Sequence, residues 1–280
     1  MRRIRILFML FLATPIWASA ATPSISDIAY GQDSAQRFDV YIPGNARNAP
    51  VIFMVHGGAW LHVDKTSRDF VANKAGLWLP TGFIVVSANY RLSGNPIGEA
   101  KDIARAIGKA EQLAPSWGGD SSRFILIGHS AGAHLVALLE ADPSIADGIV
   151  KKPWLGAISL DSAALDVPSI MTRRHPRLYD RAFGKDREFW RKASPFDEIR
   201  EKLRPILLVC SKKRDDSCLQ AHRFSAKARS LGTDAPVLEV PFTHMGVDRA
   251  LGENRDFTQA VEAFMGRLDD RVKKLLDAKR

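Results

Sequence analysis

Short apolar runs recur along the chain from about residue 36, and turn residues or charged residues bound each of them. The runs predict strands at Phe38–Ile42, Val51–Val55, Phe83–Ala88, Phe124–Ile127, Leu155–Leu160, Ile206–Cys210 and Val237–Val240. A run that is apolar at every position, such as Val51–Val55, is typical of a strand buried on both faces of a parallel sheet.

Segments between these runs have helical spacing instead. Apolar residues recur at intervals of three and four at Ile103, Ile107, Ala110 and Ala114, and again at Ala221, Phe224, Ala228 and Leu231. Gly232 follows the second segment as a stop signal. The alternation predicts an α/β fold with a doubly wound, mostly parallel sheet flanked by helices. Because no repeat or linker divides the chain, we expect a single domain over residues 21–280.

Two stretches depart from the alternation. Residues 162–204 connect two predicted strands through polar, arginine-rich sequence. A connection of this length is functional or carries helices of its own, and we expect a cap-like insertion here. Residues 267–280 predict a charged C-terminal helix that packs one apolar edge on the domain, and contact with a membrane or a partner is the alternative.

The first twenty residues predict an export signal. Arg2, Arg3 and Arg5 precede an apolar stretch, Ile6–Trp17, and a small-residue site, Ala18–Ala20. An uncleaved membrane anchor is the alternative, but spanning a bilayer takes about 20 apolar residues. We therefore expect cleavage near Ala20 and export to the periplasm or the medium.

Composition and charge change this picture little. Hydrophobic residues make up 46% of the chain and charged residues 25%, which is typical of a globular protein. The formal net charge is +9. Without the three arginines of the export signal, the chain has 37 basic and 31 acidic residues. The balance indicates no nucleic-acid partner, and the hydropathy pattern predicts no stable membrane insertion.

Cys210 and Cys218 are the two cysteines of the chain. In an exported protein an even count favours a disulfide, and two buried free thiols are the alternative. A zinc site is not expected, because no second pair of ligands stands at the required spacing.

The segment Gly128–Gly132, with sequence Gly-His-Ser-Ala-Gly, has the G-x-S-x-G form. An apolar run precedes it and a helix-forming run follows it, as a nucleophile elbow requires. Ser130 is therefore the predicted nucleophile. A structural turn with an idle serine is the alternative.

A glycine pair follows an earlier predicted strand, in the segment His56–Trp60. Acyl transfer builds negative charge on a carbonyl oxygen, which preplaced backbone N–H groups stabilise. Adjacent glycines expose such groups. The predicted oxyanion hole is formed by Gly57 or Gly58 together with Ala131.

Among the seven histidines, His244 is the predicted general base. It alone follows the last predicted strand, in a short loop, and the chain order Ser, acid, His is that of the α/β-hydrolase triad.

The acid is expected after the strand Ile206–Cys210, where Asp215 and Asp216 stand side by side. One of them would accept the imidazole N–H and set its tautomer. The spacing does not choose between them.

At this point the chain resembles the α/β-hydrolases of the carboxylesterase type. The resemblance rests on His56–Trp60, Asn89–Leu92, Gly118–Asp120 and Gly128–Gly132 and covers about residues 36–265. The closest branch holds bacterial feruloyl-esterase-like proteins and kynurenine formamidases, which implies Ser130 as nucleophile, His244 as base and Gly57 and Gly58 in the oxyanion hole. Many members place Val-Pro shortly after the aspartate, where Ser217 and Cys218 stand here. Between the two candidates we favour Asp216.

The sequence therefore predicts an exported serine esterase that cleaves carboxylic esters of small molecules through an acyl-enzyme, without cofactor or metal. The alternative within enzymes is hydrolysis of an N-formyl aryl amine, as in kynurenine formamidases. A non-catalytic, hydrolase-like binding protein is the alternative outside enzymes, and it requires a broken triad. The sequence does not indicate the oligomeric state.

Overall fold

Eight strands form one sheet within the residues that the computed structural model describes, which are 22–61, 65, 68–162 and 164–279. The strands are β1 (Ile25–Ala29), β2 (Arg37–Tyr41), β3 (Ala49–Val55), β4 (Ile84–Ala88), β5 (Gly119–His129), β6 (Gly156–Leu160), β7 (Ile206–Ser211) and β8 (Val237–Val240). Their order in the sheet is β1-β2-β4-β3-β5-β6-β7-β8. The pairs from β4 to β8 are parallel, whereas β1 and β2 are antiparallel to their neighbours. This arrangement confirms the predicted mostly parallel sheet.

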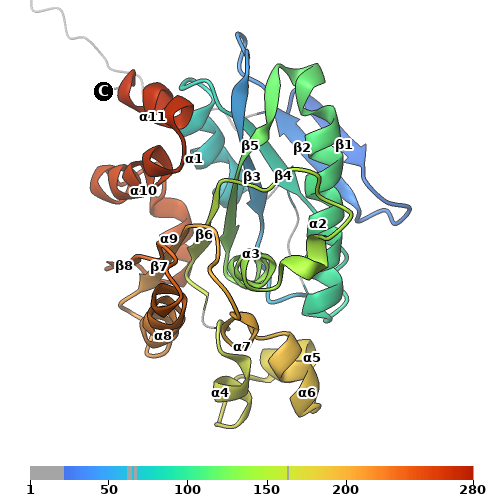
Figure 1. Ribbon diagram of the computed structural model, residues 1–280, viewed down its shortest axis with the longest axis vertical. Coiled ribbons are helices and arrows are strands. Elements are labelled where there is room, and N and C mark those ends of the chain that lie inside the picture. The colour runs from blue at the N-terminus through green and yellow to red at the C-terminus, as the bar shows by residue number, and fades with distance from the viewer. Residues whose placement is uncertain (1–21, 62–64, 66–67, 163, 280) are drawn as a thin grey trace, which may run out of the picture.

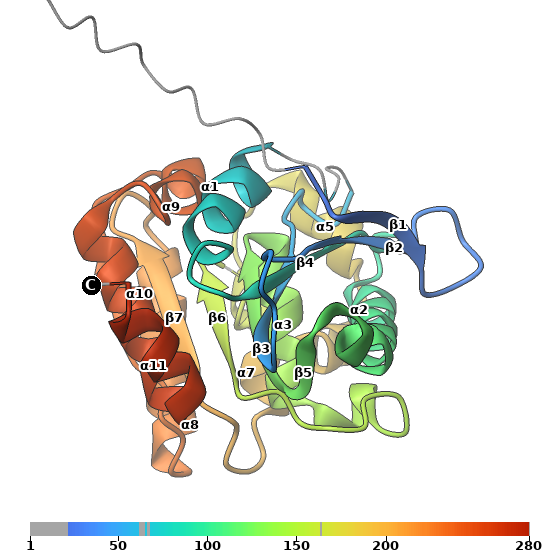
Figure 2. The ribbon, with the colours of Figure 1, turned by 90° about the horizontal axis from the view of Figure 1, so that it is seen from above.

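Helices cover both faces of the sheet (Figure 2). One face carries α2 (Pro96–Leu113), α3 (Ala131–Ala141) and α8 (Ser217–Ser230). The other carries α1 (Arg68–Trp78), α9 (His244–Ala250), α10 (Arg255–Leu268) and α11 (Asp270–Asp277). Short 3₁₀ helices lie at Ala114–Trp117 and Pro143–Ala146.

The two faces explain why the central strands are apolar throughout. In β3, Val51, Phe53 and Val55 pack into the core on the α2–α3 side, whereas Ile52 and Met54 pack into the core on the α1–α10 side. Side chains alternate along a strand, so a strand with helices on both sides needs an apolar residue at every position.

The connection between β6 and β7 forms the predicted cap. It contains α4 (Val167–Met171), α5 (Arg177–Phe183), α6 (Arg187–Lys192) and α7 (Pro195–Glu198). These short helices gather at one end of the molecule beyond α3 (Figure 1). They lie over the edge of the sheet at which the parallel strands end, so they are placed to cover a site there.

Two regions differ from the sequence-based expectations, and a third cannot be compared with them. The pattern did not predict β1, which is short and largely exposed. The helix predicted over residues 267–280 is α11, which begins only at Asp270 because α10 extends to Leu268, and Val272 and Leu276 bury its apolar edge as expected. The predicted export signal, residues 1–20, lies outside the described residues. None of the helices among the described residues is long and apolar enough to cross a membrane.

Candidate active site

Ser130 stands at the turn between β5 and α3. Its backbone has φ 57° and ψ −115°, a strained conformation that is typical of functional sites. The turn is tight enough to need both flanking glycines. A Cβ on Gly128 would lie 2.2 Å from the carbonyl oxygen of Gly132, and a Cβ on Gly132 would lie 2.1 Å from that of Val55. The structure therefore forms the predicted elbow around Ser130.

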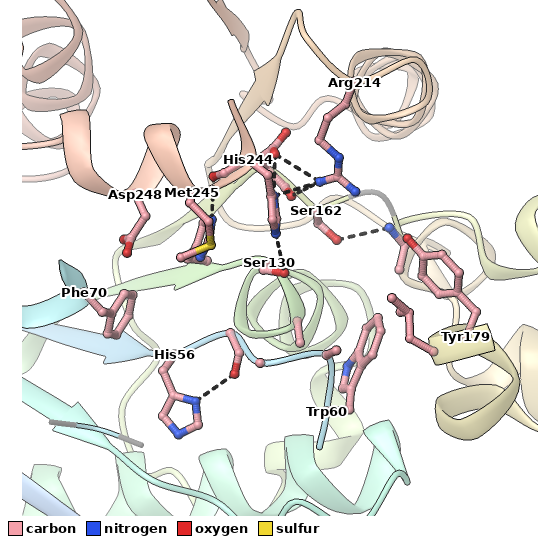
Figure 3. A pocket seen from close by; sticks show the side chains of 18 residues that line it. His56, Trp60, Phe70, Ser130, Ser162, Tyr179, Arg214, His244, Met245 and Asp248 are labelled. Carbon is pink, nitrogen blue, oxygen red and sulfur yellow. Dashed lines mark hydrogen bonds and ion pairs between the residues drawn. The ribbon is translucent and has the colours of Figure 1, made fainter. Parts of the chain in front are cut away.

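His244 meets Ser130 from the first turn of α9. Its Nε2 lies 2.9 Å from Ser130 Oγ, and its Nδ1 lies 2.6 Å from Asp161 Oδ2. Asp161 follows β6 directly and is fully buried, whereas a third of the His244 side chain is exposed. A serine hydroxyl, an imidazole and a buried carboxylate are thus hydrogen-bonded in series (Figure 3).

The structure corrects the predicted acid. Asp216, which the sequence favoured, and its neighbour Asp215 follow β7, but among the described residues neither makes a hydrogen bond or ion pair with His244. Instead, Asp161 occupies the position at Nδ1. The chain order Ser, acid, His still holds, because Asp161 lies between Ser130 and His244. The physical reason for the error is that β6 and β7 are neighbours and parallel, so residues after either strand arrive at the same edge.

The segment from the end of β7 to the start of α8 holds this carboxylate in place. Asp161 Oδ1 accepts hydrogen bonds from Ser211 N at 2.8 Å and from Ser217 Oγ at 2.5 Å. Arg214 Nη1 lies 3.0 Å from Asp161 Oδ2 and 3.0 Å from the Asp161 carbonyl oxygen. All three partners lie between Cys210 and Cys218, which form a disulfide. The structure thus contains the disulfide that the sequence favoured, but the bridge closes a loop that binds the acid instead of carrying it.

These contacts keep Asp161 ionised. Burial by itself would raise its pKa, but the hydrogen bonds from His244 and Ser217 and the charge of Arg214 outweigh burial and hold the pKa of this carboxyl well below its usual range. An ionised carboxylate at Nδ1 fixes the tautomer of His244, with Nδ1–H donating to Asp161 and Nε2 left to accept from Ser130.

The glycine-rich segment after β3 lies against the serine. A Cβ on Gly57 would be 2.9 Å from Ser130 Cβ, so only glycine permits this approach. Gly57, Gly58 and Ala131 line the same cavity as Ser130, where their roles as oxyanion-hole donors stay a prediction. Ala59 and Trp60 have φ of 54° and 61°, which costs non-glycine residues about 1–2 kcal/mol each.

Packing around this segment stabilises its strained backbone. The ring of Trp60 contacts those of His134, Tyr179 and Phe183, with centroid distances of 5.3, 6.1 and 5.1 Å. The Tyr90 hydroxyl donates to the carbonyl oxygen of His56 at 3.0 Å, and its ring stacks on that of His56. Through Tyr90, the Asn89–Leu92 motif therefore holds the backbone and the ring of His56 in position.

The two histidines that flank the elbow, His129 and His134, are buried and lie within hydrogen-bond distance of backbone carbonyl oxygens. Burial lowers the pKa of His129 and that of His134 to about 4, so both rings are neutral near pH 7. His129 Nε2 lies 3.0 Å from the carbonyl oxygen of His244 and so holds the backbone of His244. His134 Nε2 lies 2.8 Å from the carbonyl oxygen of Ala193 and connects α3 to the cap.

A cavity of about 470 Å³ opens above Ser130, and the cap forms one of its walls (Figure 3). Its apolar lining comes from Trp60, Phe70, Leu178, Tyr179 and Met245. Asp248 also lines it, but the Lys74 ammonium neutralises that carboxylate at 2.7 Å. The size and apolar lining suit a small organic substrate. Among the described residues, no cluster of three or more His, Cys, Asp or Glu side chains is arranged to hold a metal ion.

An esterase and a formamidase are among the known proteins that are similar to this chain in sequence. The family model BD-FAE matches residues 38–146. Esterase LipQ of Mycobacterium tuberculosis is 28% identical over 263 residues, which are 86% of this chain and 62% of the relative. Kynurenine formamidase of Danio rerio is 28% identical over 123 residues, which are 44% of this chain and 40% of the relative. The chain thus spans less than two thirds of the length of these two proteins.

Solved structures show the same fold. A truncated carbohydrate esterase from gut microbiota has a TM-score of 0.73 at 19% identity and covers 89% of this chain and 98% of its own. Esterase B from Lactobacillus rhamnosis has a TM-score of 0.71 at 18% identity and covers 94% and 91%. The chain therefore has the α/β-hydrolase fold, and the predicted resemblance to serine esterases with this fold is confirmed.

Proposed function

We propose that the protein hydrolyses carboxylic esters of small molecules through a covalent acyl-enzyme. The observation that carries the proposal is the series of hydrogen bonds from Ser130 through His244 to Asp161, at the floor of a largely apolar cavity. The esterases among the similar proteins support the same reaction class.

Each group has a role in the proposed reaction. Ser130 Oγ attacks the ester carbonyl while His244 Nε2 takes its proton, and Asp161 stabilises the imidazolium. The N–H groups of Gly57 or Gly58 and of Ala131 stabilise the oxyanion of the tetrahedral intermediate. When the intermediate collapses, His244 returns the proton to the leaving alcohol. Water then repeats these steps on the acyl-enzyme and releases the acid.

Labelling with a fluorophosphonate probe tests the nucleophile. The probe should label the wild-type protein, and Ser130→Ala should abolish labelling. The substitution should reduce ester hydrolysis to the residual acceleration of about 10³–10⁴ that remains without a triad. Labelling that survives in the variant would assign the nucleophile elsewhere.

Formamide hydrolysis is the second candidate, because kynurenine formamidases of Danio rerio and Salmo salar match 44% of this chain. Comparison of kcat/KM for short-chain aryl esters, an unactivated alkyl ester and N-formylkynurenine on one preparation separates the two. We expect the esters to react faster. A clear preference for the formamide over every ester would favour the second candidate.

Export is also part of the proposal. The composition of residues 1–20 motivates it, and the Cys210–Cys218 disulfide is compatible with an oxidising compartment. Expression of the full chain in a bacterium, followed by N-terminal sequencing of the periplasmic fraction, should give a mature protein that begins near Ala21. Recovery of uncleaved protein in the membrane fraction would contradict export with cleavage.

A further inference from the structure

Arg214 is a charged residue in the wall of an otherwise largely apolar cavity. A quarter of its side chain is exposed, and it occupies the loop after β7, where the acid was expected. Among the described residues, the guanidinium of Arg214 donates to Asp161 through Nη1, which also lies 2.9 Å from His244 Nδ1, and it contacts the Tyr179 hydroxyl. A guanidinium has five N–H donors in a planar fork, so most of its donor capacity is not used by the triad.

Two hydroxyl groups lie on the same side of the cavity as this guanidinium (Figure 3). The Tyr179 hydroxyl is close to it: burial raises the pKa of Tyr179, and the charge of Arg214 opposes part of that rise. Ser162 Oγ accepts a hydrogen bond from Ala164 N at 3.2 Å, which leaves its own hydrogen for an acceptor. A guanidinium fork with two hydroxyl donors beside it can form several hydrogen bonds with the two oxygens of a carboxylate.

The surroundings of the cavity favour an anion as well. The segments 173–181 and 212–216 contain seven basic and three acidic residues. The first of them includes most of α5, whose Leu178 and Tyr179 line the cavity, and the second includes Arg214 itself. Arg177, Arg181 and Lys213 are exposed and form no ion pair among the described residues. Unpaired cations around a site raise the local concentration of anionic substrates.

We propose that Arg214, with Tyr179 and Ser162, binds a carboxylate of the substrate, so that the preferred substrates are esters that carry a free carboxylate. This inference rests on the proposed ester hydrolysis and names its substrate class. Only the imidazole of His244 separates the guanidinium from the serine hydroxyl, since Arg214 Nη1 lies 2.9 Å from Nδ1 and Ser130 Oγ lies 2.9 Å from Nε2. In the proposed substrate, the free carboxylate is therefore only a few bonds away from the ester carbonyl that Ser130 attacks.

Matched pairs of esters test the inference, because each pair differs only in charge. One pair carries the group on the leaving alcohol: 3-acetoxybenzoate and 3-acetoxybenzamide. The other carries it on the acyl chain: the mono-4-nitrophenyl ester of glutaric acid and the corresponding ester of glutaramic acid. The readout is the ratio of kcat/KM for carboxylate over carboxamide within a pair, which cancels any general damage to the triad.

We expect the wild-type protein to prefer the carboxylate by about tenfold or more in at least one pair, and we expect added salt to reduce the preference. Arg214→Gln should remove it. Tyr179→Phe does not touch the triad and should reduce the ratio in the same direction by a smaller factor. Lys213→Gln, a neighbouring exposed cation, is the matched control for overall charge and should lower the ratio much less than Arg214→Gln does.

The outcomes separate this inference from the proposed function. If the wild-type protein hydrolyses the neutral esters and Arg214→Gln has the wild-type ratio, carboxylate recognition is wrong while ester hydrolysis stands. An equal fall of the ratio in Lys213→Gln would attribute the preference to overall charge and also overturn the inference. If no ester of either pair reacts and Ser130 is not labelled by a fluorophosphonate, the proposed function itself is wrong.

Discussion

The segments that follow β6 and β7 have similar positions in the fold but opposite chemistry. β6 ends at Leu160 and is followed at once by Asp161, a fully buried carboxylate. β7 ends at Ser211 and is followed by a loop whose Arg214 contacts that carboxylate. The segment after β6 thus supplies the charge that the triad needs, and the segment after β7 supplies the donors that hold it.

This difference shows that a site at the edge of a parallel sheet is specified by position in space and not by a particular strand. Asp161 N donates to the carbonyl oxygen of Val209 at 2.8 Å, so the residue after β6 is paired directly with β7. A carboxylate carried by either strand therefore reaches the same imidazole. The loop after β7 does not carry the acid. It is closed by the disulfide, and its Arg214 binds the carboxylate of Asp161.

The largest test of the comparison replaces the acid in each segment. Asp161→Asn should lower kcat about 10⁴-fold, because an amide at Nδ1 favours the wrong tautomer of His244, while the fold stays intact. Asp216→Asn, the matched change after β7, should lose little activity. Steady-state kinetics with one activated ester measures both. Loss of activity in Asp216→Asn with an active Asp161→Asn would restore the sequence-based assignment.

The next test opens the loop after β7. A Cys210→Ser/Cys218→Ser double variant removes the bridge without leaving a free thiol. The closed loop of nine residues predicts a loss of about 2.6 kcal/mol in the free energy of unfolding. Displacement of the three donors to Asp161 should also reduce kcat, by up to about 10²-fold for a shift of about 1 Å.

Urea unfolding and kinetics on the same preparation separate the two effects of the bridge. Lower stability with unchanged kcat would mean that the disulfide supports the fold alone and that the loop keeps its position without it.

Much of the fold was accessible from the sequence, because burial on both faces of the sheet forces continuous apolar runs. β8 lies at Val237–Val240, as the pattern predicts, and β7 differs from its predicted range by one residue. β1 was missed because it is an exposed edge strand, for which no burial imposes a pattern. The division of the C-terminal segment into α10 and α11 depends on Asp269, whose side chain accepts hydrogen bonds from the first residues of α11.

The candidate site was only partly accessible. Ser130 could be identified because its turn needs glycines at fixed positions, and His244 because it follows the last strand. The acid has no such local requirement, since its role depends on which side chains meet beyond the strands. One signal was present in the sequence, because Asp161 directly follows the predicted strand Leu155–Leu160. The structure gives Asp161 a φ of 55°, a conformation that Asp tolerates better than most residues. The role of Arg214 depends wholly on tertiary contacts.

A smaller effect is expected from a single donor to Asp161, Ser217, which is the first residue of α8. Ser217→Ala removes a hydroxyl that donates to Asp161 Oδ1 and should lower kcat about tenfold, the value of one hydrogen bond to a charged group. Ser225→Ala is the matched control, because Ser225 is also buried in α8 but donates to the carbonyl oxygen of Ala235, away from the site. It should reduce stability with kcat unchanged. Equal kcat values for the two variants would show that Ser217 does not position the acid.

The smallest effect expected concerns pH. The contacts of Asp161 hold its pKa in the native state below the value near 3.9 of an unfolded chain, so the native state binds fewer protons than the unfolded state at acidic pH. The stability that the carboxylate contributes is therefore complete above about pH 4 and is lost as the pH falls toward the native pKa. The Asp161→Asn variant has no carboxylate to protonate at this position, so only the wild-type protein loses this stability as the pH falls. The difference between their free energies of unfolding should therefore shrink by up to about 1.4 kcal/mol per pH unit below about pH 4. Urea unfolding between about pH 6 and pH 3 measures this difference. A difference that stays constant down to pH 3 would mean that His244, Ser217 and Arg214 do not hold Asp161 ionised, and the support assigned to the loop after β7 would be wrong.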